Sequence, residues 1–228
     1  MKALTICPTR GRVERFKEFL SSFQDMTSER TELLVICDRD DPCLMDYKQI
    51  YPDVEFKERA SLTEIFNTAF KEKYWYDFYH LANDDFIYHT KNWDITFADM
   101  EKECGKGIFY GSDLLQNDNL CVAPFISGDI IRALGWLQMP GLYHLYGDMV
   151  WKNLGQILNI LFYNKDVVIE HKHWLNNKEL IDDVYKVTNS PAMYKKDGDA
   201  FKVWYEQQMD FDVQKIKEVV TAYENRPK

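Results

Sequence analysis

Residues 3–37 read ALTICPTRGRVERFKEFLSSFQDMTSERTELLVIC, and this stretch decides the fold class. Ala3–Cys7 and Leu33–Cys37 are short apolar runs, the pattern of strands that are buried on both faces. Between them, four apolar residues recur at helical spacing: Val13, Phe16, Leu20 and Phe23. Strand, helix and strand in close succession form a βαβ unit, which builds a parallel sheet. We therefore predict an α/β fold, a mostly parallel sheet flanked by helices.

The rest of the chain continues this alternation. Ser61 and Glu64 have the spacing of a capping box, which predicts that a helix begins there. Further strands are predicted at 78–82, 108–110, 121–126, 157–163 and 167–170, and further helices at 93–104, 127–134 and 148–154. From Asn176 the chain is polar, with one or two terminal helices. We predict a domain over residues 1–175 and a C-terminal helical extension, residues 176–228, packed on it.

Composition narrows the class of protein. Hydrophobic residues make up 46% of the 228 residues, enough for a sizeable core, which excludes a wholly disordered chain. The net charge of −9 argues against a generic polyanion binder. Five cysteines without a CxxC pair indicate reduced thiols, so we expect a cytoplasmic protein. We expect no membrane span, and the N-terminal apolar run reaches Pro8 too soon for a signal peptide.

Polar clusters follow three of the predicted strands. They are Pro8–Arg12, Asp38–Asp41 and Asn83–Asp85. Ligands of an open α/β sheet bind beyond the carboxyl ends of its strands, so we expect the three clusters to meet at one edge. Carboxylates at such a position can hold Mg²⁺ or Mn²⁺, although Asn and Asp also favour simple polar turns.

Other residues near these clusters have two interpretations each. Arg10 and Arg12 could clamp phosphate, because guanidinium matches phosphate oxygens, or they could be solvated loop residues. Asp38 could accept hydrogen bonds from a base or a ribose, or could belong to a turn. Asn67 lies beside the apolar stripe of its helix, so it could contact a nucleotide or be exposed.

The second half of the chain adds further candidates. Asp148 could cap a helix or act as a general base toward an acceptor hydroxyl. His171 and His173 would share one face of an extended segment, either as metal ligands or as a structural pair. Trp136 and Tyr146 could stack on sugar faces or pack in the core.

Taken together, these motifs resemble a known family. Five segments occur in the same order as similar segments in GT-A glycosyltransferases of the family 2-like kind. They are Pro8–Arg12, Asp38, Asn67, the Asn-Asp-Asp-Phe run at 83–86, and Trp93-Asp94. Gly147-Asp148 is similar to the catalytic segment of that family, and residues 170–173 are similar to its late His-containing strand. The resemblance covers residues 1–175 and implies a GT-A domain that binds a nucleotide-sugar and carries the catalytic residues.

The resemblance implies transfer of a sugar from a nucleotide-diphosphate-sugar donor to a hydroxyl of a glycan, a small molecule or a modified nucleic-acid base. Implied donor-binding residues are Thr9, Arg10, Arg12, Asp38, Asn67, Asn83 and Asp84; implied ligands of Mn²⁺ or Mg²⁺ are Asp85, His171 and His173; the implied acceptor-binding residues are Trp136 and Tyr146. Asp148 would be the base, and its position implies inversion at the anomeric carbon, with a retaining reaction as the alternative. The family has an acidic residue at the position of Asn83, so contact with the ribose or the metal is weakened there. Asp85 is therefore the main candidate for the metal ligand, and Asp84 is the second candidate.

Two other functions compete with this one. A metal-dependent nucleotidyltransferase also uses a nucleotide, paired acids and a parallel sheet, but it usually opens with a Gly-rich loop, and residues 8–12 contain one glycine. A non-catalytic nucleotide or glycan binder on the same fold would bind the donor without metal-dependent transfer.

Overall fold

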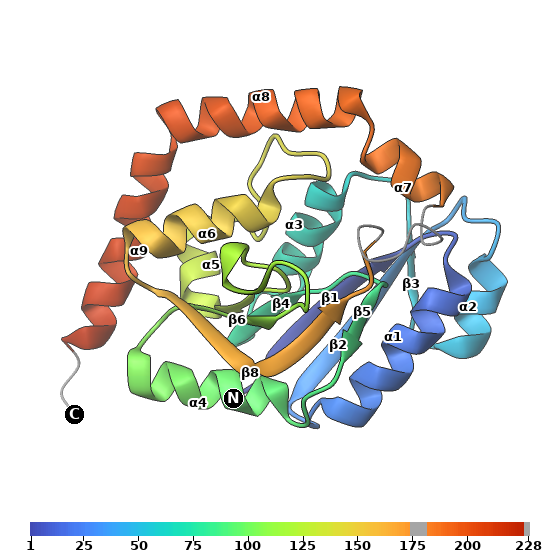
Figure 1. Ribbon diagram of the computed structural model, residues 1–228, viewed down its shortest axis with the longest axis horizontal. Helices are drawn as coiled ribbons and strands as arrows, with labels where there is room; N and C mark the ends of the chain where they lie inside the picture. The colour runs from blue at the N-terminus through green and yellow to red at the C-terminus, as the bar shows by residue number, and fades with distance from the viewer. Residues whose placement is uncertain (174–181, 226–228) are drawn as a thin grey trace.

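The computed structural model describes residues 1–173 and 182–225 (Figure 1). Its strands are β1 (Ala3–Thr9), β2 (Thr31–Asp38), β3 (Glu55–Lys57), β4 (Phe78–Leu81), β5 (Phe86–Tyr88), β6 (Ile108–Ser112), β7 (Phe125–Ser127) and β8 (Leu161–His171). They form one sheet in the order β3-β2-β1-β4-β7-β6-β8-β5.

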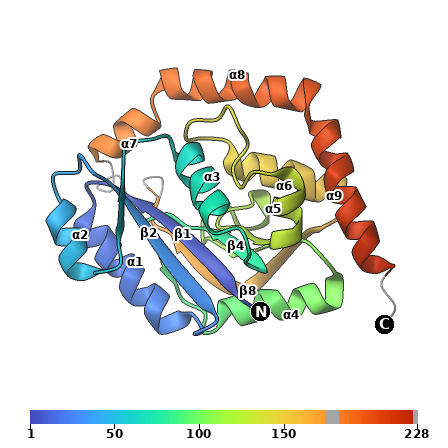
Figure 2. The same cartoon turned by 180° about the vertical axis from the view of Figure 1, so that it is seen from behind.

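Helices cover both faces of this sheet (Figures 1 and 2). One face carries α1 (Val13–Met26), α2 (Leu44–Ile50) and α4 (Trp93–Cys104). The other face carries α3 (Leu62–Glu72), α5 (Gly128–Leu134), α6 (Gly147–Ile157), α8 (Pro191–Gln207) and α9 (Met209–Glu224). Two short elements complete the described chain: the 3₁₀ turn η1 (Asn117–Asn119) and helix α7 (Asp183–Thr188).

The central strand β1 shows why the sheet needs helices on both sides. Successive side chains of a strand point to opposite faces. Leu4 and Ile6 belong to the core under α3, α5 and α6, whereas Ala3 and Cys7 belong to the core under α1, α2 and α4. All four are buried, so the continuous apolar run at the N-terminus is the sequence of a strand covered twice.

The predicted α/β fold with flanking helices is confirmed, and the sheet is mixed. β1 pairs in parallel with β2 and β4, and β3 and β8 also have a parallel neighbour. β7 is antiparallel to both β4 and β6, and β5 is antiparallel to β8. The capping box is present: Ser61 Oγ accepts from the backbone N–H of Glu64 at 3.2 Å, and Glu64 Oε2 accepts from that of Ser61 at 2.8 Å.

Two local predictions were wrong. The strands predicted at 157–163 and 167–170 are the single strand β8, whose pairing with β6 shifts from Gly111–Asn164 to Ser112–Val168. The extra residues are absorbed by an irregularity in the ladder and not by a turn. The strand predicted from Cys121 begins at Phe125, because residues 121–124 leave the sheet and line a cavity.

Ser127 does not cap α5 with its side chain. Its hydroxyl instead accepts from the backbone N–H of Gly107 at 2.9 Å and contacts Glu101 at 2.5 Å. The hydroxyl therefore joins β7 to the start of β6 and to α4.

The C-terminal helices pack on the second face of the sheet. α9 contacts α5, α6 and α8, and the side chains of Trp204 and Ile216 are buried in the core on that side. Residues 176–181 and 226–228 of the predicted extension lie outside the described residues. Within the described ranges, no helix combines the length and apolarity that a membrane crossing requires.

A neutral histidine lies inside the central sheet. His80 of β4 is fully buried, with Nδ1 3.1 Å from the carbonyl oxygen of Pro124 and Nε2 2.8 Å from the hydroxyl of Tyr88. A carbonyl can accept but not donate, so Nδ1 carries the hydrogen and Nε2 accepts from the tyrosine. Burial lowers the pKa of His80 to about 3.

This histidine makes stability depend on pH. Below a pH of about 6.5, this histidine binds a proton in the unfolded chain but stays neutral in the folded chain. Acid therefore destabilises the fold. We expect His80→Gln to remove about 1.4 kcal/mol per pH unit from the slope of the unfolding free energy between pH 6 and pH 4. Urea unfolding of both proteins at several pH values measures this, and equal slopes would contradict it.

Candidate functional site

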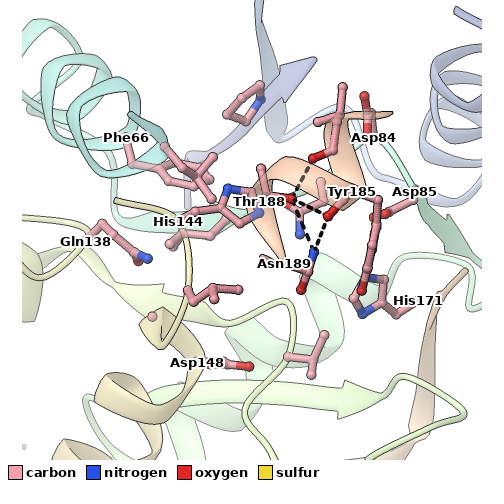
Figure 3. A pocket seen from close by; sticks show the side chains of 18 of the residues that line it. Phe66, Asp84, Asp85, Gln138, His144, Asp148, His171, Tyr185, Thr188 and Asn189 are labelled. Atoms are coloured by element: carbon pink, nitrogen blue, oxygen red, sulfur yellow. Dashed lines mark hydrogen bonds and ion pairs between the residues drawn. The ribbon is translucent and has the colours of Figure 1, made fainter. Parts of the chain in front are cut away.

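A cavity of about 750 Å³ lies beyond the carboxyl ends of β1, β2 and β4 (Figure 3). The three predicted strand-end clusters converge on it. Of the residues predicted for the site, the cavity is lined by Thr9, Arg10, Arg12, Asp38, Asn83, Asp84, Asp85, Tyr146, Asp148, His171 and His173. Side chains separated by more than 160 positions thus share one space, as expected for the ligand edge of an open sheet.

Arg10 is paired with carboxylates at the rim. Its Nη1 is 2.9 Å from Asp38 Oδ2 and 2.5 Å from Asp40 Oδ1. Burial raises the pKa of Asp38 although Arg10 opposes the shift, whereas the hydrogen bond from Arg10 lowers the pKa of the exposed Asp40. Arg10 therefore holds the Asp38 carboxylate at the edge of the cavity.

Arg12 makes the densest set of polar contacts. It holds Asp182, at the start of α7, with two parallel bonds: Nε to Oδ2 at 2.8 Å and Nη2 to Oδ1 at 3.1 Å. Its Nη1 lies 3.2 Å from Asp84 Oδ1 and 3.6 Å from Asp85 Oδ2. Thr9 donates its hydroxyl to Asp84 Oδ2 at 2.8 Å. Both oxygens of Asp84 are thus engaged by the protein.

Asp85 differs from Asp84 in that one of its oxygens has no hydrogen-bond partner among the described residues. Asp85 Oδ1 is buried and has no hydrogen-bond partner within the described residues, and His171 Nε2 faces it at 3.5 Å. Burial would raise the pKa of Asp85, but His171 and then Arg12 outweigh it and lower that pKa. Burial raises the pKa of Asp84 to about 6, against Arg12 and with help from the charge of Asp85.

His171 sits among acidic side chains. Burial would lower its pKa, but the charges of Asp85, Asp113 and Asp148 outweigh burial and raise it. Sequence reasoning missed Asp113, which follows β6; its Oδ1 accepts three backbone N–H groups of residues 115–117 at 2.7–3.1 Å. Its Oδ2 is buried and unpartnered within the described chain. This part of the cavity therefore favours positive charge.

The predicted metal ligands are divided by the structure. Asp85 and His171 lie together, whereas the imidazole of His173 is hydrogen-bonded to the hydroxyl of Tyr185 on α7. Across residues 1–173 and 182–225, no three His, Cys, Asp or Glu side chains form a group that could hold a metal ion by themselves. A Mg²⁺ or Mn²⁺ ion needs only one or two protein ligands when phosphate oxygens supply the others.

Asp148 lies in the first turn of α6, and Tyr146 occupies the capping position. Asp148 Oδ1 accepts the backbone N–H of Met149 at 2.8 Å, and the carboxylate lines the cavity. Burial raises the pKa of Asp148, with the Met149 N–H and the charge of His171 opposing the shift. A half-buried carboxylate of raised pKa has the properties of a general base.

The loop before α6 is fixed by a residue that the sequence did not single out. Asp197 of α8 is fully buried and accepts the backbone N–H groups of Tyr143, His144 and Leu145 at 2.7–2.9 Å. The loop thereby presents His144 to the cavity (Figure 3). Burial and then the charge of Arg12 lower the pKa of His144 to about 4, so this imidazole is neutral.

Two predicted residues do not reach the cavity. Asn67 is used by the backbone: its Oδ1 accepts from the N–H groups of Leu137 and Gln138 at 2.7 and 2.9 Å, and its Nδ2 donates to the carbonyl of Gln138 at 2.8 Å. Trp136 packs in the core, with its ring centroid 5.3 Å from that of Trp151. Asn67 and Trp136 were predicted to bind ligands, but the structure places both in structural roles away from the cavity lining.

Solved structures share this architecture. S. aureus TarS 1–349 matches 98% of this chain and 83% of its own, with a TM-score of 0.58 and 14% identity. A mannosyltransferase from Pyrobaculum calidifontis, in complex with GDP-Man and Mn²⁺, matches 100% of this chain and 76% of its own, with a TM-score of 0.58 and 10% identity. The chain has a GT-A fold. No protein-family model and no curated protein matches the sequence.

The matched part is smaller in other TarS structures. Another structure of S. aureus TarS is matched over 36% of its chain, and TarS 1–349 in complex with UDP-GlcNAc over 57%, each with 74% of this chain. The TM-scores are 0.57 and 0.56 at 15% identity. This chain therefore spans little more than a third of the first of these TarS chains.

The loop held by Asp197 is open to a direct test. Asp197→Asn replaces one carboxylate oxygen by an NH₂ group, so at least one backbone N–H of residues 143–145 loses its acceptor. We expect the unfolding free energy to fall by about 1–3 kcal/mol, with faster hydrogen exchange in the loop.

Asp199→Asn on the same helix is the matched control, because Asp199 is exposed and paired with Lys195 on the surface. We expect it to change stability by less than about 0.5 kcal/mol. Equal effects of the two substitutions would show that the loop does not depend on Asp197.

Proposed function

We propose that this chain is a glycosyltransferase that moves a sugar from a nucleotide-diphosphate-sugar donor to an acceptor hydroxyl. One observation carries the proposal: Asp84 and Asp85, at a strand end, face the same cavity of about 750 Å³ as Asp148, at a helix start (Figure 3). That volume lies in the range of about 300–1,000 Å³ of small-molecule sites. The complexes of TarS with UDP-GlcNAc and of the mannosyltransferase with GDP-Man support a donor of this class.

The strand-end residues would bind the nucleotide part of the donor. Asp38, held by Arg10 at the rim, can accept hydrogen bonds from a base or a ribose. Thr9 and Arg12 would act on the donor indirectly, because both donate hydrogen bonds to the Asp84 carboxylate and so fix its position. Asn83 lines the cavity beside them and offers a neutral amide where the resembled family has an acid.

The residues present fit a divalent cation. Asp85 offers a buried oxygen without a hydrogen-bond partner in the described chain, and His171 offers an imidazole nitrogen beside it. We propose that these two residues hold Mn²⁺ or Mg²⁺, and His173 instead contacts α7 through Tyr185. The cation would offset the negative charge that develops on the departing diphosphate.

Asp148 would take the proton of the acceptor hydroxyl. The acceptor oxygen then forms a bond with the anomeric carbon, and the bond from that carbon to the diphosphate breaks, its electron pair leaving with the diphosphate. A base on the side of the sugar opposite the diphosphate gives inversion. The raised pKa of Asp148 suits this role, because a carboxylate in a partly buried site binds a proton more readily than one in water.

Product analysis tests the reaction class. The protein is incubated with Mn²⁺ and a panel of nucleotide-sugars that starts with UDP-GlcNAc and GDP-mannose, and in parallel with nucleoside triphosphates and sugar phosphates. We expect release of a nucleoside diphosphate from one nucleotide-sugar. Pyrophosphate release from a triphosphate would instead show a nucleotidyltransferase, and donor binding without turnover would show a non-catalytic binder.

Replacing the base should affect chemistry more than binding. We expect Asp148→Asn to lower kcat by about 10²–10⁴-fold, because an amide cannot take the acceptor proton, while the Kd for the nucleoside diphosphate stays within about twofold. Steady-state kinetics and calorimetry measure the two quantities. A variant with near-normal kcat would remove Asp148 from the mechanism.

Replacing the proposed metal ligand should affect the metal requirement. Asp85→Asn keeps the size of the side chain but removes its charge, and we expect metal-dependent turnover to disappear and tight Mn²⁺ binding in the presence of nucleoside diphosphate to be lost. Asp99→Asn, exposed on α4, is the control and should behave as the wild type. An unchanged Mn²⁺ affinity in Asp85→Asn would contradict the assignment.

A further inference from the structure

Gln138 places a polar amide in the wall of the cavity. Its side chain is 4% exposed and lines the cavity. Figure 3 shows the amide pointing from its loop into the open space. An amide carries both hydrogen-bond donors and an acceptor, so a molecule bound in the cavity can exchange hydrogen bonds with it.

The backbone of Gln138 is held firmly. The side chain of Asn67 accepts its N–H and donates to its carbonyl oxygen, and also accepts the N–H of Leu137. The neighbours Leu137 and Met139 are buried in the core. The position of the amide is therefore determined by α3 and the core, so the amide is presented at a fixed place in the wall.

The amide also lies directly against the start of α6. A Cβ atom built on Gly147 would be 2.0 Å from Gln138 Nε2 and 2.6 Å from Oε1, so the amide occupies the space that any side chain at position 147 would need. The next residue is Asp148, the proposed base. Gln138 therefore lies at the end of the cavity where the transferred sugar would meet the acceptor.

We infer that Gln138 binds a hydroxyl group of the sugar being transferred and thereby selects the donor. The amide offers both a donor and an acceptor, which matches a hydroxyl better than a phosphate, because phosphate oxygens at neutral pH mainly accept. Gln138 is almost fully buried, whereas Asp148 is half-buried, so Gln138 faces the inner reactant, the donor sugar. The inference rests on the proposed glycosyltransferase function and adds its specificity-determining residue, with Asn67 as a positioning residue.

The test combines a variant with altered donors. The nucleotide-sugar that supports turnover is compared with analogues in which one sugar hydroxyl is replaced by hydrogen, using the wild type and Gln138→Leu. For one analogue, we expect kcat/KM of the wild type to fall about 10–100-fold. Gln138→Leu should lose a similar factor with the natural donor and should no longer distinguish that analogue from it.

Two further variants keep the test decisive. Gln138→Glu retains an acceptor and loses the donor, so its discrimination at the same hydroxyl should differ from that of the wild type. This variant keeps the test decisive if Gln138→Leu does not fold. Asn67→Ala should weaken that discrimination through the displaced backbone. The affinity for the free nucleoside diphosphate, which lacks the transferred sugar, should stay within about twofold in all three variants.

The outcomes separate the two proposals. If the wild type releases no nucleoside diphosphate from any nucleotide-sugar, the proposed function fails, and the inference fails with it. If the wild type is active and the Gln138 variants still discriminate every hydroxyl as the wild type does, the assignment of Gln138 is overturned and the proposed function stands.

Discussion

The structure of the site depends on the charge contacts of Arg12. One mostly buried guanidinium faces three carboxylates, those of Asp84, Asp85 and Asp182. These groups come from the end of β1, the end of β4 and the start of α7, so the contacts join segments that are far apart in the sequence. Removing one partner of a buried ion pair typically costs about 3–5 kcal/mol, because the remaining charge is left uncompensated. Arg15 also contacts Asp182, at 3.3 Å, and His171 faces Asp85 at 3.5 Å. The charges of Asp113 and Asp148 add to the negative charge around His171.

The C-terminal helices belong to this site as much as the strands do. Asp182 receives Arg12 and also accepts the backbone N–H of Tyr185, so it fixes the first turn of α7 against the strand ends. Asp197 of α8 orders the loop that leads to Asp148. The polar sequence of this region predicts an extension, whereas its described residues complete the wall of the cavity.

What the sequence predicted and what it did not can be understood from the range of the contacts. The capping box at Ser61 and the polar cluster at residues 83–85 are local features, so neighbouring residues reveal them. Asn67 matches a position in the motif of the resembled family, but its hydrogen-bond partners lie about seventy residues away in the sequence. Its side chain therefore bonds to the backbone of those residues and does not face the cavity. Asp182 acts over a longer separation, 170 residues from Arg12, and Asp197 over a separation of 54 residues from Tyr143. One signal for Asp197 existed: it lies at helical spacing from apolar residues of α8, where a carboxylate needs buried partners.

We propose that the strand ends, α6 and α7 enclose a nucleotide-sugar beside a divalent cation. Crystals grown with a nucleoside diphosphate and Mn²⁺ can be examined by anomalous diffraction at the manganese edge. We expect one manganese peak between Asp85 and His171, with the diphosphate against it and the nucleoside toward Asp38. A nucleotide bound on another face of the molecule, with no manganese at Asp85, would show that this cavity is not the donor site.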